Sequence, residues 1–163
     1  MRDILWAPWR IKYIKSAKRQ KGCFFCQALK SKGKNYIIFR NKYSFAILNI
    51  FPYNNGHIMV SPKRHIKDLR QLKKHEVTDL FDSLKETLAS LDRVLKPEGY
   101  NIGINSGRAG GAGVLSHLHI HIVPRWSGDT NFMPLISGTK VIAQSLDELY
   151  RDLSSKHVKP KRG

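Results

Sequence analysis

The chain has 163 residues, 41% of them hydrophobic and 25% charged, so it is long enough to bury a core without disulfide bonds. It has no apolar stretch that would span a membrane and begins without the apolar core of a signal peptide, which predicts a cytoplasmic protein. Lysine and arginine exceed aspartate and glutamate by 29 − 12 = 17 charges; this imbalance either attracts nucleotides and nucleic acids or forms a solvated basic surface.

The predicted elements alternate between short strands and one long helix. A single domain is expected over residues 1–163, with a basic lead-in at 1–22 and a basic tail at 156–163. Short apolar runs between polar or turn-forming residues predict strands at 36–39, 45–48, 57–60 and 100–105.

Helical periodicity is clearest in the middle of the chain. Apolar side chains at steps of three and four residues predict a helix from 75 to 95, which Pro97 and Gly99 end. A shorter helix is expected at 141–153. Because strands dominate around one long helix, the expected class is α+β with a largely antiparallel sheet.

The cysteines predict a metal site. Cys23 and Cys26 are the only two in the chain, and their spacing is that of a metal-binding pair. Two thiolates from one turn favour zinc, and a closed tetrahedral site needs two further ligands. His65 and one histidine of a later triplet are candidates. The alternatives are two buried cysteines without metal, or a redox pair.

The most informative run extends from His117 to Arg125, with histidines at 117, 119 and 121. A strand presents alternate side chains on one face, and a hydrophobic core has no use for three polar rings in a row. Imidazole is a nucleophile toward phosphorus, a metal ligand and a proton donor near neutral pH. The glycine-rich segment 107–113, directly upstream, lets backbone N–H groups approach phosphate oxygens. The pattern predicts a phosphate-directed site in which one histidine attacks and the others bind charge or metal.

This run resembles the signature of the histidine triad (HIT) superfamily of nucleotide hydrolases and transferases. Segments 45–49 and 56–62 are also similar to that family, and the resemblance spans roughly residues 23–126. The runs at 5–10 and 124–133 resemble a bacterial branch that includes diadenosine tetraphosphate phosphorylases. The resemblance implies a HIT-like fold in which two half-barrels pair in a homodimer.

The resemblance also implies roles for individual residues. His119 matches the nucleophile that attacks the α-phosphorus and carries a nucleotidyl-histidine intermediate, while His121 and His57 match contacts to the phosphate and the leaving group. The expected substrate-binding positions are Asn49 at the ribose, Asn105 near the phosphates, the backbone at Gly113, and Arg125, for which a surface salt bridge is the alternative.

The same resemblance implies that His117 joins Cys23, Cys26 and His65 around a zinc ion. Four protein ligands leave no position for substrate, so this zinc is expected to be structural.

The leading functional prediction is a homodimeric nucleotidyl hydrolase or transferase that acts on dinucleoside polyphosphates. Water as acceptor makes it a hydrolase; phosphate makes it a phosphorylase (ATP adenylyltransferase), which the run after Arg125 favours. An alternative is a nucleic-acid-associated zinc protein that acts on adenylated DNA ends or binds nucleic acid through its basic surface. That alternative predicts salt-dependent DNA binding that survives replacement of His119. A third is a nucleotide-binding regulator, which a trapped nucleotidyl adduct on His119 would exclude.

Overall fold

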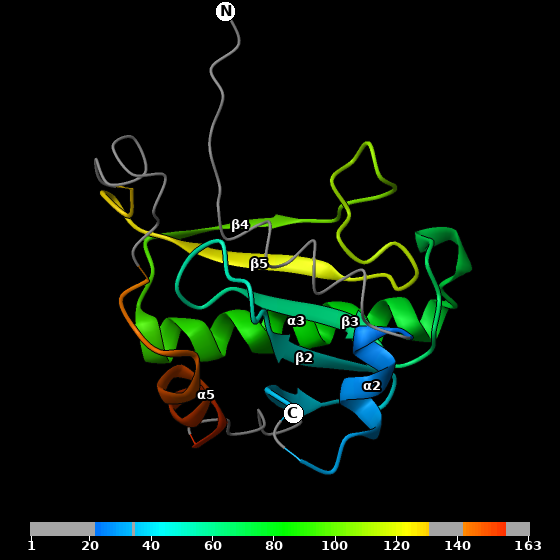
Figure 1. Cartoon of the computed structure of the whole chain (residues 1–163), viewed down its shortest axis with the longest axis horizontal. Coiled ribbons are helices and arrows are strands. Elements are labelled where there is room, and N and C mark those ends of the chain that lie inside the picture. The colour runs from blue at the N-terminus through cyan, green and yellow to red at the C-terminus, as the bar shows by residue number, and fades with distance from the viewer. Residues whose placement is uncertain (1–21, 34, 131–141, 156–163) are drawn as a thin grey trace, which may run out of the picture.

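The computed structural model describes residues 22–33, 35–130 and 142–155, so most of the lead-in, the tail and the first residue of the second expected helix lie outside it. The described residues form one five-stranded antiparallel sheet with the strand order β1-β2-β3-β5-β4 (Figure 1). Its strands are β1 (Ile37–Arg40), β2 (Ser44–Leu48), β3 (Ile58–Pro62), β4 (Gly99–Gly103) and β5 (Ile120–Arg125). In this part of the chain no helix has the length and apolar character needed to cross a membrane.

Helices pack on both faces of the sheet. The long helix α3 (Lys74–Leu95) runs behind the strands in Figure 1, and its buried face packs with α5 (Leu146–Ser155) against one side of the sheet. The short helix α2 (Phe24–Lys30) packs on the other side, where Phe25 contributes to a second apolar cluster with residues of β1, β2 and β3. A 3-10 turn, η1 (Leu69–Gln71), leads into α3. The predicted α+β class with a largely antiparallel sheet and one long helix is confirmed.

The boundaries differ from the predicted ones at both ends of the chain. Helix α2 was not predicted. The sequence indicated only a turn that holds both cysteines, whereas the structure has a seven-residue helix directly after Cys23. The second expected helix begins at Leu146, and residues 142–145 are not helical. Its start follows from Ser145, whose hydroxyl accepts a hydrogen bond from the Glu148 backbone N–H at 3.2 Å.

The histidine strand is shorter than predicted. Strand β5 begins at Ile120, so only His121 lies within it, and His117 and His119 lie in the segment before it. The ladder with β3 stops because β3 ends at Pro62, which has no backbone N–H to donate. The backbone of Leu118 bonds elsewhere: its N–H donates to the Ile66 carbonyl, and its carbonyl accepts from the Ser61 hydroxyl. This segment still brings the rings of His119 and His121 together, with centroids 4.8 Å apart.

A glycine is required where the chain enters β3. Gly56 has φ +77°, and a Cβ there would lie 2.5 Å from Leu95 and 2.9 Å from Pro124. The close approach of β5 and α3 at this point fixes the turn just before His57, which directly precedes β3.

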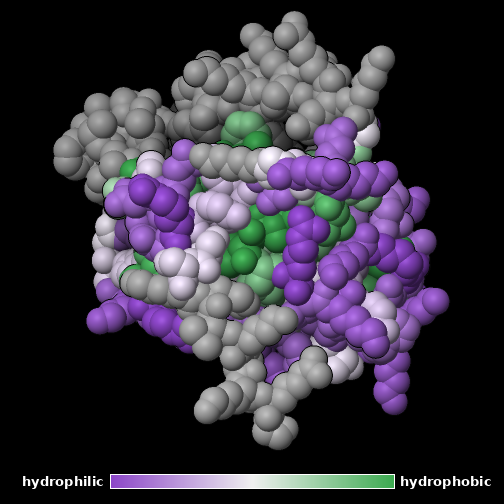
Figure 2. Space-filling view, turned by 90° about the horizontal axis from the view of Figure 1, so that it is seen from below, coloured by the Kyte–Doolittle hydropathy of each residue, from purple (hydrophilic) through white to green (hydrophobic). Residues whose placement is uncertain are grey.

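The surface is mainly hydrophilic, as the composition predicts. Figure 2, which looks at the molecule from the β1 side of Figure 1, shows hydrophilic side chains around a smaller hydrophobic area.

Candidate functional site

The four predicted metal ligands meet at one end of the sheet. Their ligand atoms all lie within 4.8 Å of one another: Cys23, Cys26, His65 and His117. Nδ1 of His117 lies 3.2 Å from the Cys23 sulfur and 3.6 Å from the Cys26 sulfur, and Nδ1 of His65 lies 3.3 Å from the Cys26 sulfur. Cys23 is the residue before α2 and Cys26 lies in its first turn, so the helix sets the spacing of the two thiols.

This ligand set fits zinc. In a tetrahedral zinc site the sulfur and nitrogen ligands lie about 3.3–3.8 Å from one another, which the three distances approach. The Nε2–H of His117 donates to the Pro62 carbonyl at 2.9 Å. Because a carbonyl only accepts, the Nδ1 lone pair of His117 is free to face the two sulfurs. Burial and the nearby Cys23 raise the pKa of the Cys26 thiol, so a stable thiolate pair here needs a cation.

The proposed nucleophile is held in one tautomer. Nδ1 of His119 donates to the His117 carbonyl at 2.8 Å, which leaves the Nε2 lone pair free. The His119 side chain is buried, and its ring lies 5.0 Å from that of Phe25. Burial lowers the pKa of His119, so the ring is neutral at physiological pH and its lone pair is available.

His57 and His121 are hydrogen-bonded to each other, which fixes the tautomers of both rings. The backbone N–H of Tyr53 donates to Nδ1 of His57 at 3.0 Å, and the Asn49 amide lies 3.2 Å from the same atom. A neutral His57 therefore carries its proton on Nε2, which lies 2.9 Å from Nδ1 of His121. That bond leaves His121 with its proton on Nε2. His121 thus offers an Nε2–H donor, and its ring lies 4.8 Å from that of His119.

The acidities of this pair follow from their surroundings. Burial, followed by the neighbouring His121 and His119, lowers the pKa of His57 to about 3. Burial and His119 lower the pKa of His121 to about 4. Both rings are neutral near pH 7, so the site has hydrogen-bond donors for phosphate without cationic imidazoles.

These lowered pKa values predict that acid destabilises the fold. Below about pH 6.5 the unfolded chain binds a proton at His57 that the folded chain excludes until about pH 3. The free energy of unfolding therefore rises with pH across this window, by up to about 1.4 kcal/mol per pH unit from His57 alone. The measurement is urea unfolding of the wild type and of His57→Gln from about pH 6.5 to about pH 4.5, where most carboxylates remain ionised. The slope should be smaller in the variant, and equal slopes would contradict the assignment.

The loop between β2 and β3 is fixed by contacts to the end of β5. The Asn54 amide donates to the Pro124 carbonyl at 3.0 Å and to the Asp129 carboxylate at 2.8 Å. Asp129 also accepts two hydrogen bonds from Arg125, at 2.6 and 3.1 Å, and Arg125 donates to Asn101 at 2.6 Å. The sequence left open whether Arg125 binds phosphate or forms a salt bridge; the structure contains the salt bridge, and a phosphate contact stays a prediction.

Asn49 lies beside the histidine pair. Its carbonyl oxygen accepts from the Phe51 backbone N–H at 2.9 Å, so its amide nitrogen faces His57. The contact with the ribose itself stays a prediction.

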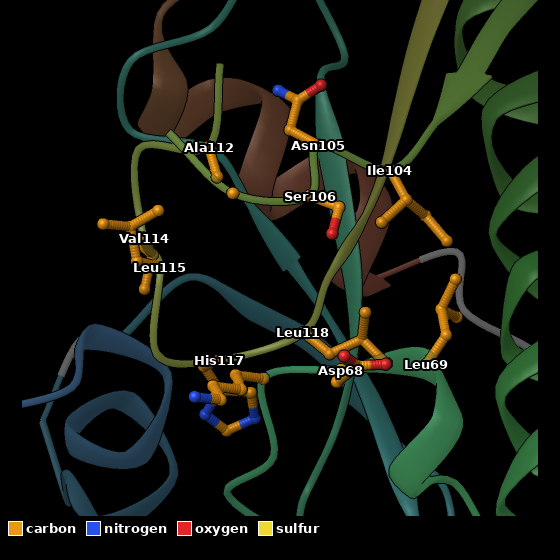
Figure 3. A pocket seen from close by; sticks show the side chains of 12 residues that line it. Asp68, Leu69, Ile104, Asn105, Ser106, Ala112, Val114, Leu115, His117 and Leu118 are labelled. Carbon is orange, nitrogen blue, oxygen red and sulfur yellow. The ribbon is translucent and has the colours of Figure 1, made fainter. Parts of the chain in front are cut away.

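Asn105 lines a small pocket of about 50 Å³ (Figure 3). Gly113 lies between two other lining residues, Ala112 and Val114. Asn105 and Ser106 line one end of this pocket, and Asp68 and His117 lie toward the other. The Asn105 amide lies 3.5 Å from the Gly111 carbonyl, which folds the glycine-rich segment back on itself. Gly113 precedes Val114, a lining residue, and is exposed. The described contacts do not join Asn105 or Gly113 to His119.

Sequence reasoning missed several residues that order the site. Phe25 packs on the rings of both His117 and His119, with centroids 5.1 and 5.0 Å away. Tyr53 orients His57, and Asp129 holds the loop that carries Tyr53. The only available signal was the position of Phe25 between the two cysteines and of Tyr53 just before the Asn-Asn-Gly turn.

A cluster of three histidines beside a Cys2His2 ligand set is the arrangement expected of a histidine triad protein, and the comparisons agree. The HIT domain family matches residues 30–128. An AP-4-A phosphorylase of Mycobacterium tuberculosis is 36% identical over 160 residues, which cover 93% of this chain and 82% of the relative. The asymmetrical bis(5′-nucleosyl)-tetraphosphatase of Schizosaccharomyces pombe is 37% identical over 93 residues, covering 57% of this chain and 50% of that protein.

Solved structures agree with the sequence relatives. A Zn-bound histidine triad family protein of Mycobacterium smegmatis superposes with a TM-score of 0.67 at 27% identity, covering 82% of this chain and 91% of that one. The chain belongs to the HIT family, and the prediction of a HIT-type enzyme is confirmed.

Proposed function

We propose that this enzyme transfers a nucleotidyl group from a dinucleoside polyphosphate through a covalent intermediate on His119. The observation that carries the proposal is the fixed Nε2 lone pair of buried His119, with the His121 donor next to it. The AP-4-A phosphorylase and the tetraphosphatase among the relatives support this substrate class.

In the first step the Nε2 lone pair of His119 forms a bond to the α-phosphorus, and the bond from that phosphorus to the bridging oxygen breaks. The leaving nucleotide departs with the electron pair on its oxygen, next to the Nε2–H of His121. His119 then has substituents on both nitrogens and carries a positive charge, which the His117 carbonyl stabilises through Nδ1–H.

In the second step an oxygen of the acceptor attacks the same phosphorus, the phosphorus–nitrogen bond breaks, and its electron pair returns to Nε2 of His119. Splitting one displacement into two lets a single histidine serve both. Inorganic phosphate as acceptor releases a nucleoside diphosphate, and water releases a nucleoside monophosphate. We favour phosphate, because the phosphorylase relative aligns with nearly the whole chain.

We assign zinc to Cys23, Cys26, His65 and His117, where the ligand geometry and a Zn-bound relative support it. Zinc held there supplies rigidity rather than Lewis acidity, since four protein ligands complete its coordination. The chain's own contribution is the short connection from ligand His117 to His119, whose Nδ1–H is fixed by the carbonyl of that ligand.

We also propose that the enzyme works as a homodimer in the cytoplasm. Strand β4 lies at the edge of the sheet and pairs only with β5 within the described residues. Exposed apolar side chains occur on β4, α3 and η1: Ile102, Phe81, Val77 and Leu69. A second copy of the chain paired at β4 would cover the open strand edge and the exposed Ile102.

The direct test is an assay with diadenosine tetraphosphate, with and without inorganic phosphate, and separation of the products by chromatography. Phosphate-dependent formation of ADP and ATP is expected. AMP and ATP without a need for phosphate would make the enzyme a hydrolase. No turnover would contradict the proposed substrate class and direct attention to nucleoside phosphoramidates and adenylated nucleic acid.

A further inference from the structure

Tyr53 is an exposed aromatic residue at the edge of the histidine cluster. Its side chain is 51% exposed, whereas His57 beneath it is 1% exposed. The Tyr53 ring lies 4.7 Å from that of His57 and 5.8 Å from that of His121, with interplanar angles of 34° and 31°. One side of the ring thus covers the histidine pair, and the exposed half of the side chain faces solvent.

The backbone fixes the position of this ring. The Tyr53 N–H is committed to Nδ1 of His57, and the next residue, Asn54, is held by Pro124 and Asp129. An aromatic ring on such a fixed segment loses little conformational freedom when a ligand stacks on it. This differs from an exposed tyrosine on a loose loop, for which binding would have to order the segment first.

The rings form a row that is closed at one end and open at the other. Buried Phe25 lies 5.0 Å from His119, His119 lies 4.8 Å from His121, and His121 lies 5.8 Å from Tyr53. At the closed end the rings next to His119, those of Phe25 and His117, are both buried. The leaving nucleotide must depart before the acceptor enters, while the transferred nucleotide stays on His119. The open end of the row suits the part that departs.

We propose that the exposed side of Tyr53 stacks on the base of the leaving nucleotide and thereby selects substrates that carry a second nucleoside. The proposal rests on the function proposed above and adds to it a substrate contact on the leaving-group side. A planar base is the ligand chemistry that fits a half-exposed aromatic ring beside a phosphate site, because every base offers a π-face of matching size.

The experiment compares two substrates that share the adenylyl group and a chain of four phosphates. Diadenosine tetraphosphate releases a leaving group with a base, and adenosine 5′-tetraphosphate releases inorganic triphosphate without one. The ratio of their kcat/KM values is measured for the wild type, Tyr53→Phe and Tyr53→Leu. Any general damage to the His57–His121 pair affects both substrates and cancels in the ratio.

Tyr53→Leu should lower the ratio about tenfold or more, because a stacked base contributes that much to binding. Tyr53→Phe, which keeps the aromatic face, should retain most of it. Tyr43→Leu is the matched control: this tyrosine is half-buried and stacks on His75, at the opposite end of β2 from the loop that carries Tyr53. Its ratio should equal that of the wild type.

An unchanged ratio for Tyr53→Leu overturns the proposal, even if both activities fall together, since the ring would then act only by covering His57. If the wild type turns over neither substrate, the proposed function is overturned, and the Tyr53 contact with it. Turnover of both substrates by the wild type, with an unchanged ratio in the leucine variant, leaves the proposed function in place and removes Tyr53 from it.

Discussion

Replacement of His119 by alanine is expected to lower the turnover of diadenosine tetraphosphate by about 10⁴-fold or more, since the variant has no nucleophile to carry the intermediate. The structure offers no equivalent substitute, because the lone pair of His57 Nδ1 is occupied by the Tyr53 N–H and that of His121 Nδ1 by His57. The measurement is steady-state turnover, together with mass spectrometry of acid-quenched wild-type enzyme, which should contain an adenylyl group on the peptide that includes His119.

His75→Ala serves as the control for this experiment, because His75 is exposed at the start of α3 and its ring contacts Tyr43 rather than the site. Its activity should remain close to that of the wild type. A His119→Ala chain that keeps its zinc and its melting temperature but retains more than about one hundredth of the activity would rule out covalent catalysis at this position.

The second large effect concerns stability. His65→Ala is expected to lower the free energy of unfolding by well over 2 kcal/mol and to reduce the bound zinc, because a metal ligand contributes binding energy directly to folding. His65 is exposed on the surface, and apart from its contacts to Cys26 and His117 it has no core role that would explain such a loss. Zinc content by atomic absorption and urea unfolding with and without a chelator measure both effects.

His75→Ala is again the matched comparison, since an exposed histidine outside a metal site should change stability by no more than about 0.5 kcal/mol. If the two variants behave alike and the wild type contains no zinc, the Cys2His2 cluster is not a metal site. The redox alternative would instead appear as a disulfide between Cys23 and Cys26 in the oxidised protein.

The cysteine pair and the histidine run could be recognised in the sequence because both rest on short, regular spacings, and the structure brings the four predicted ligands together. Two cysteines three residues apart must share a turn, and alternate histidines must share a face of an extended segment. These rules need no knowledge of the tertiary fold. Strands β1, β2 and β3 also followed from their apolar runs, but their register did not, because β2 and β3 are buried on both faces and show no alternation.

Other features depend on partners that are distant in the chain, and no local pattern indicates them. The tautomer of His57 follows from the backbone of Tyr53, and the position of Tyr53 follows from Asn54 and its bond to Asp129, 75 residues away. The early end of the β3–β5 ladder follows from Pro62, whose effect depends on which strand lies beside it. Helix α2 was missed because seven residues are too few for a clear helical period.

The proposed metal ligands are far apart in the chain, so they are not synthesised together. Cys23 and His117 are separated by 94 positions, so at typical rates of elongation the two thiols leave the ribosome about 5–20 s before their main partner. Strand β5 pairs between β3 and β4 and is the last strand to be made among the residues that the structure describes. A nascent chain that ends before residue 117 therefore exposes an unliganded cysteine pair and an incomplete sheet, which makes this enzyme dependent on its final third for protection from oxidation and aggregation.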